Sequence, residues 1–286
     1  MVKENEKRLP TIEQYNRRLE DGQRRGIMGN YEFDGEKYKK ASAHQQEWGN
    51  KIISELTFTG TENILDLGCG DGRLTKRLAD LVPEGKVVGI DASVGMINTA
   101  REIEQQNLSF ICMDINKMNF DNEFDLIFSN AALHWVKDHQ RLYDNCRKAL
   151  RAKGRIRFSF AGDGNCSYFF EVIRQVIDDA AYREYFKNFV WPWYMPKLSY
   201  YKELVKGQDF REMRIWEENA DRYFSSKEDL IKWIDQPTIV PFLELLPDEI
   251  KIRFRNEVVQ RMVDKTINPD GTCFETFRRI NVFIRN

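Results

Sequence analysis

The chain has 286 residues, of which 42% are hydrophobic, and its 44 basic residues nearly balance its 45 acidic residues. This composition can build a sizeable core, and a net charge of −1 argues against a surface that binds nucleic acid. No apolar run approaches the roughly 18 residues that span a bilayer, and the charged start of the chain does not resemble a secretory signal. We therefore expect a cytoplasmic protein that makes no membrane contact.

Five scattered cysteines, without a Cys-x-x-Cys pair, favour reduced thiols over a disulfide framework or a zinc site. The three histidines have no acidic spacing around them, so we expect no metal. His44 and His139 are interpreted as surface or helix-end residues.

Residues 1–37 are dense in charge and predict an N-terminal arm, either solvated or a lid that orders when ligand binds. From residue 51 to residue 160, short apolar strands alternate with helical patterns. Strands are expected at residues 63–68, 86–91, 108–114, 124–130 and 155–160. Helices are expected at residues 72–82, at 93–106 with Ser93 as cap, and at 140–154 with Gly154 closing the helix. This alternation predicts a doubly wound, mostly parallel α/β sheet covered on both faces.

After residue 160 the pattern changes. Helices are expected at 168–181, 226–234 and 248–264, strands at 211–224 and 273–284, and an aromatic, proline-rich stretch lies at 188–201. Residues 38–165 are therefore predicted to form a cofactor-binding core. Residues 166–286 are predicted to supply the late strands of the same sheet and an inserted helical cap for substrate.

The stretch "ILDLGCGDGRL" ends an apolar strand with Asp66 and then places Gly68, Gly70 and Gly72 at alternate positions. A dinucleotide fingerprint would need a glycine where Arg73 stands, which disfavours a dehydrogenase. Glycines allow sharp turns and close approach of a ligand to the main chain. An acid at this place would repel a pyrophosphate and attract a cation. The loop therefore favours a ligand with an adenosine at one end and a positive amino group at the other.

Two further acids end the next strands. Asp91 closes "VVGID", where a carboxylate can accept from both hydroxyls of a ribose. Asp114 in "FICMDI" can accept from an adenine amino group, with Ile115 and Ala92 on the faces of the ring. Three acids at successive strand ends lie on one rim, where open α/β sheets bind ligands.

These segments, together with "FDLIFSNAALHWV", resemble the cofactor half of the class I S-adenosylmethionine-dependent methyltransferases over about residues 38–160. The resemblance implies a Rossmann-like sheet of seven strands with the last antiparallel, and an enzyme that converts S-adenosyl-L-methionine to S-adenosyl-L-homocysteine. It implies that Asp66 and the glycine loop hold the methionine moiety, while Asn130 and Ala131 lie beside the sulfonium. The expected cofactor-binding residues are Asp66, Gly68, Cys69, Gly70, Gly72, Asp91, Ala92, Met96, Asp114, Ile115, Asn130 and Ala131.

Two other segments, "YKKASAHQQEWG" and "NAALHWV", resemble a subgroup of small-molecule carboxyl methyltransferases that act on trans-aconitate or juvenile hormone acid. By that resemblance, Gln45 and Trp135 donate to the carboxylate of a small-molecule acid. A carboxylate needs no base because it is ionised at pH 7, whereas a hydroxyl acceptor would need one, and His134 is the candidate. The protein is expected to be a monomer or a homodimer.

Several alternatives remain open at this stage. Trp135 could instead be a core residue, Gln45 a surface residue, and the aromatic stretch the core of the cap rather than a substrate pocket. Arg278 and Arg279 are adjacent on a strand, so at most one faces the pocket. A C-methyltransferase acting on an isoprenoid, and a cofactor-binding module without catalysis, are the rival functions.

Overall fold

The computed structural model describes residues 43–208 and 210–286, which belong to one compact unit. The predicted N-terminal arm, residues 1–37, lies outside the described residues. Among the described residues, no helix is long and apolar enough to cross a membrane. The division into a cofactor core and a substrate-binding part stays a prediction.

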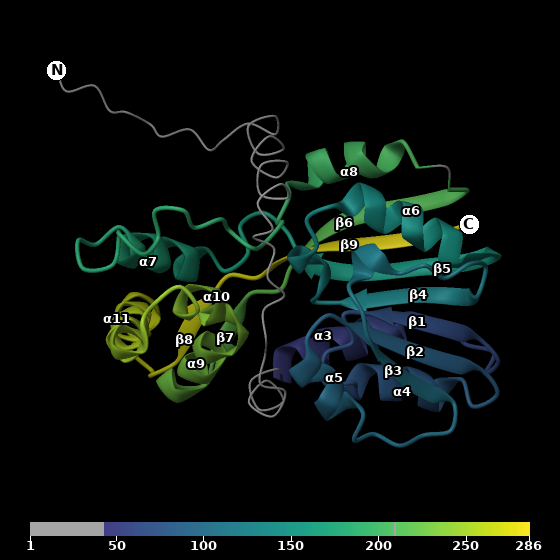
Figure 1. Ribbon diagram of the computed structural model, residues 1–286, viewed down its shortest axis with the longest axis horizontal. Helices are drawn as coiled ribbons and strands as arrows, with labels where there is room; N and C mark the ends of the chain where they lie inside the picture. The colour runs from purple at the N-terminus through teal and green to yellow at the C-terminus, as the bar shows by residue number, and fades with distance from the viewer. Residues whose placement is uncertain (1–42, 209) are drawn as a thin grey trace. The chain divides into compact units, whose positions relative to one another are not determined.

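A seven-stranded sheet carries the fold, with the order β3-β2-β1-β4-β5-β9-β6 (Figure 1). Neighbours from β3 to β5 pair in parallel, and β9 runs antiparallel to both β5 and β6. The strands are β1 (Asn63–Leu67), β2 (Lys86–Asp91), β3 (Leu108–Cys112), β4 (Phe124–Asn130), β5 (Leu150–Ala161), β6 (Glu212–Asn219) and β9 (Arg278–Arg285). The predicted Rossmann-like sheet is therefore confirmed, including its one antiparallel strand.

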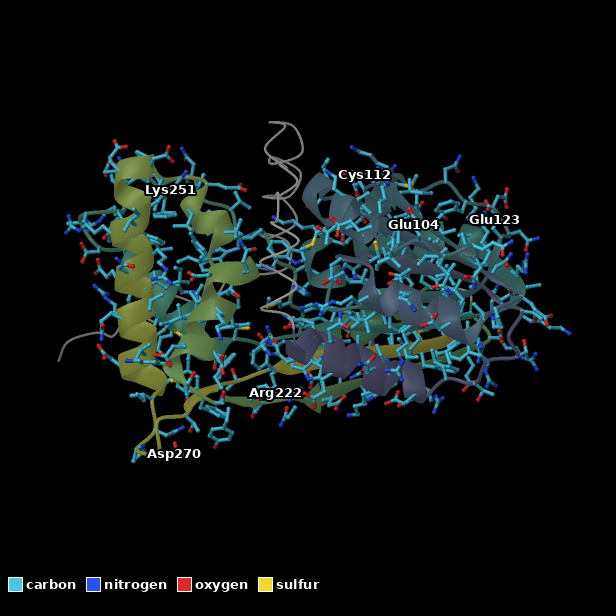
Figure 2. All side chains as sticks on the ribbon, turned by 90° about the horizontal axis from the view of Figure 1, so that it is seen from below. Glu104, Cys112, Glu123, Arg222, Lys251 and Asp270 are labelled. Carbon is cyan, nitrogen blue, oxygen red and sulfur yellow. The ribbon has the colours of Figure 1, made fainter. Side chains whose placement is uncertain are left out.

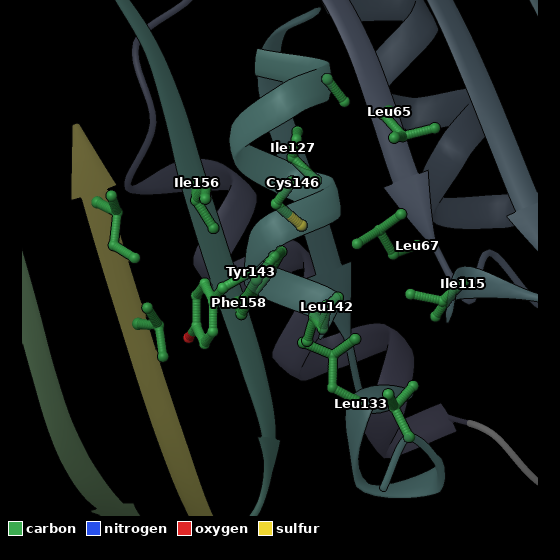
Figure 3. Packing of buried hydrophobic residues seen from close by; sticks show 14 of the residues in the cluster. Leu65, Leu67, Ile115, Ile127, Leu133, Leu142, Tyr143, Cys146, Ile156 and Phe158 are labelled. Atoms are coloured by element: carbon green, nitrogen blue, oxygen red, sulfur yellow. The ribbon is translucent and has the colours of Figure 1, made fainter. Parts of the chain in front are cut away.

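Helices cover both faces of this sheet, because the central strands are apolar on both sides. On one face, α3 (Ala43–Ser54), α4 (Arg73–Leu81) and α5 (Val94–Ala100) contribute side chains to the core. On the other face lie α6 (His139–Ala149) and α8 (Leu198–Lys206). In Figure 3, Tyr143 and Cys146 of α6 point towards the strands, next to Ile156 and Phe158 of β5.

A second hydrophobic core lies apart from the sheet, and we call it the cap cluster. It is built mainly by α7 (Ser167–Ile177), α9 (Lys227–Trp233), α10 (Val240–Leu243) and α11 (Asp248–Thr266). The short π-helical turn Ile234–Thr238 joins α9 to α10. A two-stranded ribbon of β7 (Arg222–Phe224) and β8 (Cys273–Glu275) completes it. Its helices α7, α9 and α11 lie where the sequence predicted helices after residue 160, and their role as a cap over substrate stays a prediction.

Several expected boundaries were wrong. The helix expected at 93–106 already ends at Ala100. Gly154 does not close a helix, because α6 ends at Ala149 and β5 already includes Gly154. The expected strands 211–224 and 273–284 each divide in two, into β6 with β7 and β8 with β9. Both breaks fall where Ala220 and Phe277 pair outside the ladders, since the Ala220 amide donates to the Phe277 carbonyl at 2.8 Å. At this point the two segments of the chain leave the large sheet together and continue as the two-stranded ribbon of the cap.

Candidate functional site

The glycine loop forms the turn between β1 and α4. Gly68, Gly70 and Gly72 have φ values of 71°, 55° and 80°, a region that strongly favours glycine. The Gly68 amide donates to the carbonyl of Ile90 at 2.8 Å, which ties the loop to β2. A Cβ atom at Gly68 would lie 2.2 Å from the Cβ of Ala132, so this position has no room for a side chain. The loop therefore lies directly against the segment that follows β4.

Asp91 and Asp114 present carboxylates at the same rim. One oxygen of Asp91 accepts from the Gly70 amide at 3.0 Å and the other from the Ser93 amide at 2.9 Å. Asp114 accepts from the Asn116 amide at 2.9 Å at the start of the 3-10 turn Ile115–Lys117. Each carboxylate oxygen has further lone pairs for donors such as ribose hydroxyls or an adenine amine. This acidic set of acceptors fits the adenosine of S-adenosylmethionine and would repel a pyrophosphate.

Asp66 lies below the rim, with only 2% of its surface exposed. Thr75, in the first turn of α4, donates its hydroxyl to the Asp66 carboxylate at 2.7 Å. Burial raises the pKa of Asp66 to about 7, and the negative charge of Asp91 adds to this rise, although the Thr75 hydrogen bond opposes it. Thr75 could not be selected from the sequence, because the residues around a helical threonine do not indicate which group its hydroxyl will contact.

The remaining cofactor residues expected on this rim lie in the same region. Cys69, Met96 and Ile115 are buried, and burial holds the pKa of the Cys69 thiol well above its ordinary value. The Ala92 carbonyl accepts from the Cys112 thiol at 3.7 Å. Cys112 itself is exposed, as Figure 2 shows. Contact of these residues with the cofactor stays a prediction.

The end of β4 connects three parts of the chain through Asn130. Its side-chain amide donates to the Gln45 carbonyl of α3 at 2.8 Å, and its oxygen accepts from Arg279 of β9 at 3.0 Å. Arg279 is 3% exposed, also donates to the Ser159 hydroxyl at 2.9 Å, and stacks 4.4 Å from the ring centroid of Trp48. The positive charge of Arg279 is therefore held inside the protein beside the end of β4.

Of the two adjacent arginines, only Arg279 lies at the site. Arg278 points away and pairs with Asp221, partly exposed to solvent. This agrees with the expectation that at most one of them faces the pocket.

The segment after β4 carries the predicted substrate residues. Ala131 has a φ of 56°, a strained value for a residue with a side chain, and the 3-10 turn Leu133–Trp135, called η2, follows. Among the described residues, His134 Nδ1 and Gln45 Oε1 are buried without a hydrogen-bond partner. Burial, followed by the charge of Arg279, lowers the pKa of His134 to about 3. α3 and η2 carry the residues predicted to bind the acid. Each of these two elements thus contains a buried polar atom without a hydrogen-bond partner among the described residues.

The aromatic stretch contributes both to the cap and to the neighbourhood of η2. The ring of Trp193 is buried in the cap cluster, and its centroid lies 5.2 Å from that of Trp135. The Tyr194 amide donates to the His134 carbonyl at 2.7 Å. Trp233 is buried in the cap cluster. The aromatic stretch therefore packs into the cap cluster and also contacts η2.

Two histidines interpreted as surface or helix-end residues are both packed inside the protein. His44 lies in α3 among the rings of Trp48, Phe224 and Phe277, and burial lowers its pKa to about 4. His139 begins α6, at a helix end as expected, but is 1% exposed. Local sequence could not indicate this, because two of the three rings around His44, those of Phe224 and Phe277, lie 180 and 233 positions further along the chain. In the part of the chain that the structure describes, no group of three or more His, Cys, Asp or Glu is placed to hold a metal ion.

Comparison with known proteins finds related sequences over the part of the chain that contains the glycine loop. Residues 64–154 match the family model described as a methyltransferase domain. A malonyl-[acyl-carrier protein] O-methyltransferase of Ilyobacter polytropus is 32% identical over 148 residues, which cover 50% of this chain and 54% of that protein. A second such relative, from Acetivibrio thermocellus, is covered to 49%, so the chain spans about half the length of these two relatives. A trans-aconitate 2-methyltransferase of Mycobacterium tuberculosis is 25% identical over 253 residues, which cover 87% of this chain and 94% of that protein.

Solved structures share the fold. Haemonchus contortus phosphoethanolamine N-methyltransferase 2, solved in complex with S-adenosyl-L-methionine, has a TM-score of 0.52 at 18% identity. The match covers 83% of this chain and 52% of that chain. At this identity, the likeness supports the architecture of the sheet and its helices.

Proposed function

We propose that this chain, whose residues 64–154 match a methyltransferase domain as the sequence resemblance predicted, uses S-adenosylmethionine to methylate a carboxylate oxygen of a small organic acid. The similarity to trans-aconitate 2-methyltransferases, which extends over most of the chain, supports this choice. The malonyl relatives are named for an acid that is attached to a carrier protein. Such a substrate is also a carboxylic acid and belongs to the same chemical class as the acceptor proposed here.

The rim residues have distinct roles in this proposal. When bound, S-adenosylmethionine supplies a methyl group on a positively charged sulfur. Asp91, already oriented by two backbone amides, accepts from the ribose hydroxyls, and Asp114 accepts from the adenine amine. Asp66 lowers the energy of the ammonium group through its negative charge. Asn130 and Ala131 line the place where the sulfur and the acceptor meet.

The observation that carries the proposal is the burial of His134, the candidate base, whose Nδ1 has no hydrogen-bond partner among the described residues. His134 has a pKa of about 3, so it is neutral at pH 7 and a weak proton acceptor. His139, at the other side of η2, has a pKa of about 4. Methylation of a hydroxyl or a carbon acid usually requires removal of a proton, whereas an ionised carboxylate requires none. The site therefore suits a carboxylate better than an acceptor that must be deprotonated.

The remaining residues can hold and orient such a carboxylate. The Gln45 amide and the Trp135 indole N–H are neutral donors that bind the acid without cancelling its charge. The buried guanidinium of Arg279 places a positive charge beside the end of β4. Burial is the main cause of the lowered pKa of His134 and of His44, and the charge of Arg279 contributes to both. The carboxylate, ionised at pH 7, would accept the methyl group that S-adenosylmethionine supplies when it is bound. No proton is transferred.

The test is a panel assay with a labelled methyl donor against di- and tricarboxylates, fatty acids, isoprenoid acids and their neutral alcohol or alkene counterparts. We expect label in a methyl ester of at least one acid and none in its neutral counterpart. Transfer to a carbon atom or to a hydroxyl, or cofactor binding without transfer to any member of the panel, would contradict the proposal.

Variants in the acid site sharpen the assay. Trp135→Phe and Gln45→Leu should each lower kcat/KM for the preferred acid by about 10- to 150-fold, the equivalent of roughly 1.5–3 kcal/mol for a hydrogen bond to a charged group. Cofactor affinity, measured by calorimetry, should stay within about twofold of the wild type. Gln46→Leu, on the next position of the same helix, is the matched control and should retain activity.

A further inference from the structure

A buried chain of hydrogen bonds leads from α8 to the segment that carries the acid-binding residues. His139 Nδ1 lies 2.9 Å from the Tyr201 hydroxyl, and that hydroxyl lies 2.9 Å from the hydroxyl of Tyr143. At the other side of the ring, His139 Nε2 lies 3.0 Å from the Leu133 carbonyl. His139, Tyr201, Tyr143 and Leu133 are all at most 1% exposed.

Elementary hydrogen-bond chemistry fixes the direction of this chain. A carbonyl oxygen only accepts, so Nε2 of His139 carries the hydrogen and donates to Leu133. In the neutral ring Nδ1 then accepts, so the Tyr201 hydroxyl donates to His139 and the Tyr143 hydroxyl donates to Tyr201. Burial, which lowers the pKa of His139 to about 4, keeps the ring neutral at pH 7. Every ring nitrogen and both hydroxyls are therefore engaged in one ordered arrangement.

The carbonyl that receives this chain belongs to the first residue of η2. Within η2 the Trp135 amide donates to the Ala132 carbonyl at 3.0 Å, and the Val136 amide donates to the Leu133 carbonyl at 3.0 Å. On the other side, the Tyr194 ring packs 4.8 Å from the ring of His139. Figure 3 shows Leu133 at the end of the same core that Tyr143 and Leu142 of α6 enter.

We propose that His139 is a positioning residue, whose hydrogen bonds to Leu133 and Tyr201 fix η2 and so hold Trp135 in place for methyl transfer. The kinetic part of this inference rests on the proposed function, whereas the structural part does not. A side chain at position 139 that packs but cannot donate to Leu133 should leave the fold intact and η2 loose.

The experiment compares His139→Phe, His139→Gln and Tyr201→Phe by amide hydrogen exchange without substrate. His139→Phe removes both hydrogen bonds, and we expect the Trp135 and Val136 amides to exchange about tenfold faster or more, because the loss of buried hydrogen bonds makes local opening of η2 easier. The amide introduced by His139→Gln can donate to Leu133 and should restore most of the protection. Tyr201→Phe keeps the Leu133 bond but leaves Nδ1 without its donor, so we expect an intermediate effect.

The matched control is Tyr182→Phe, which removes the hydroxyl of another buried tyrosine, bonded to Glu257 at 2.8 Å in the cap. It should leave exchange at Trp135 and Val136 unchanged. Unchanged exchange in folded His139→Phe overturns the inference, and so does equal acceleration by Tyr182→Phe, since that would show general loosening. If His139→Phe does not fold, the comparison of Tyr201→Phe with Tyr182→Phe decides by the same criteria.

Kinetics separate this inference from the proposed function. With the acid that the panel assay selects, His139→Phe should lower kcat at least about tenfold while the Kd of S-adenosylmethionine changes less than about twofold. His139→Gln should recover most of kcat. If no acid is methylated but the exchange results hold, the proposed function fails while the fixing of η2 by His139 stands. If an acid is methylated at the wild-type kcat by folded His139→Phe, the positioning role fails alone.

Discussion

At the scale of single residues, Asp66 combines burial with a place beside the glycine loop. Among the described residues, the Thr75 hydroxyl is the one side chain that donates a hydrogen bond to its carboxyl. Burial raises the pKa of Asp66 to about 7. Ionisation of a buried carboxyl is unfavourable until a positive charge approaches. The ammonium group of S-adenosylmethionine would provide that charge if Asp66 holds the methionine moiety.

Cofactor binding should therefore release protons from Asp66. In the free protein below pH 7 the carboxyl is mostly protonated, and a bound cation favours the ionised form, so its pKa falls and the proton leaves. Affinity for S-adenosylmethionine should thus rise with pH from about 5.5 to 7. Calorimetry at pH 6.5 in buffers of different ionisation enthalpy measures the release, which Asp66→Asn should abolish and the surface variant Asp80→Asn should not. Proton uptake, or a release that Asp66→Asn leaves unaltered, would contradict the assignment.

At the scale of elements, α7 begins against a strand about 100 residues further along the chain. The amides of Tyr168 and Phe169 donate to the Glu275 carboxylate at 3.2 and 2.8 Å, and the Ser167 amide donates to the Thr276 hydroxyl at 3.0 Å. The N-cap residue, Cys166, supplies no side-chain hydrogen bond. Residues of β8 and its end therefore satisfy the first amides of α7, which also gain from a negative charge at this end of the helix.

Removing Glu275 should destabilise the cap. Glu275→Ala leaves buried amides without acceptors and should lower the free energy of unfolding by about 2–4 kcal/mol, while Glu275→Gln, which keeps one acceptor oxygen, should cost less. Urea unfolding measures both. Glu171→Ala, on the exposed side of α7 where Glu171 pairs with Lys265, is the control and should cost less than about 1 kcal/mol. Equal losses for Glu275→Ala and Glu171→Ala would show that the β8 contact does not hold the helix.

The elements that the sequence predicted well are those whose pattern is local. The strands up to β5 are short apolar runs, and the helices between them show a clear apolar period. The errors arise where tertiary contacts decide. Gly154 resembles a helix terminator, yet it packs inside β5, where a Cβ atom would meet the Leu150 side chain at 2.5 Å. The breaks between β6 and β7 and between β8 and β9 depend on pairing between residues about 57 positions apart.

The same distinction applies to the site. Asp66, Asp91, Asp114 and the glycines follow strand ends, so topology alone predicts that they meet. Thr75, Arg279 and the His139 chain could not be assigned in this way, because their partners come from other elements. Arg279 needed the register of β9 against β5 to place it beside Asn130 and Ser159.

At the scale of the whole molecule, the core of the sheet and the cap cluster are joined closely within the described residues. Trp48, from helix α3 of the sheet, is buried in the cap cluster and packs edge to face against Phe277 with ring centroids 5.2 Å apart. Only Thr276 and Phe277 separate β8 of the cap from β9 of the sheet. Separate unfolding of the cap would expose Trp48 and release both ends of this connection. We therefore expect the two cores to unfold together.

Phe254→Ala tests this coupling from the cap side. Phe254 is fully buried in α11 against the rings of Tyr182 and Phe186, and its truncation should lower the free energy of unfolding by about 3–5 kcal/mol. Five of the six tryptophans belong to the cap cluster or pack against it, so tryptophan fluorescence reports mainly on the cap, while far-ultraviolet circular dichroism reports on the whole fold. In urea both signals should change at one shared midpoint in the wild type and at one lower midpoint in the variant. A fluorescence transition that precedes the dichroism transition in Phe254→Ala would show instead that the cap unfolds on its own and that the contacts of Trp48 with Phe277 do not couple the two cores.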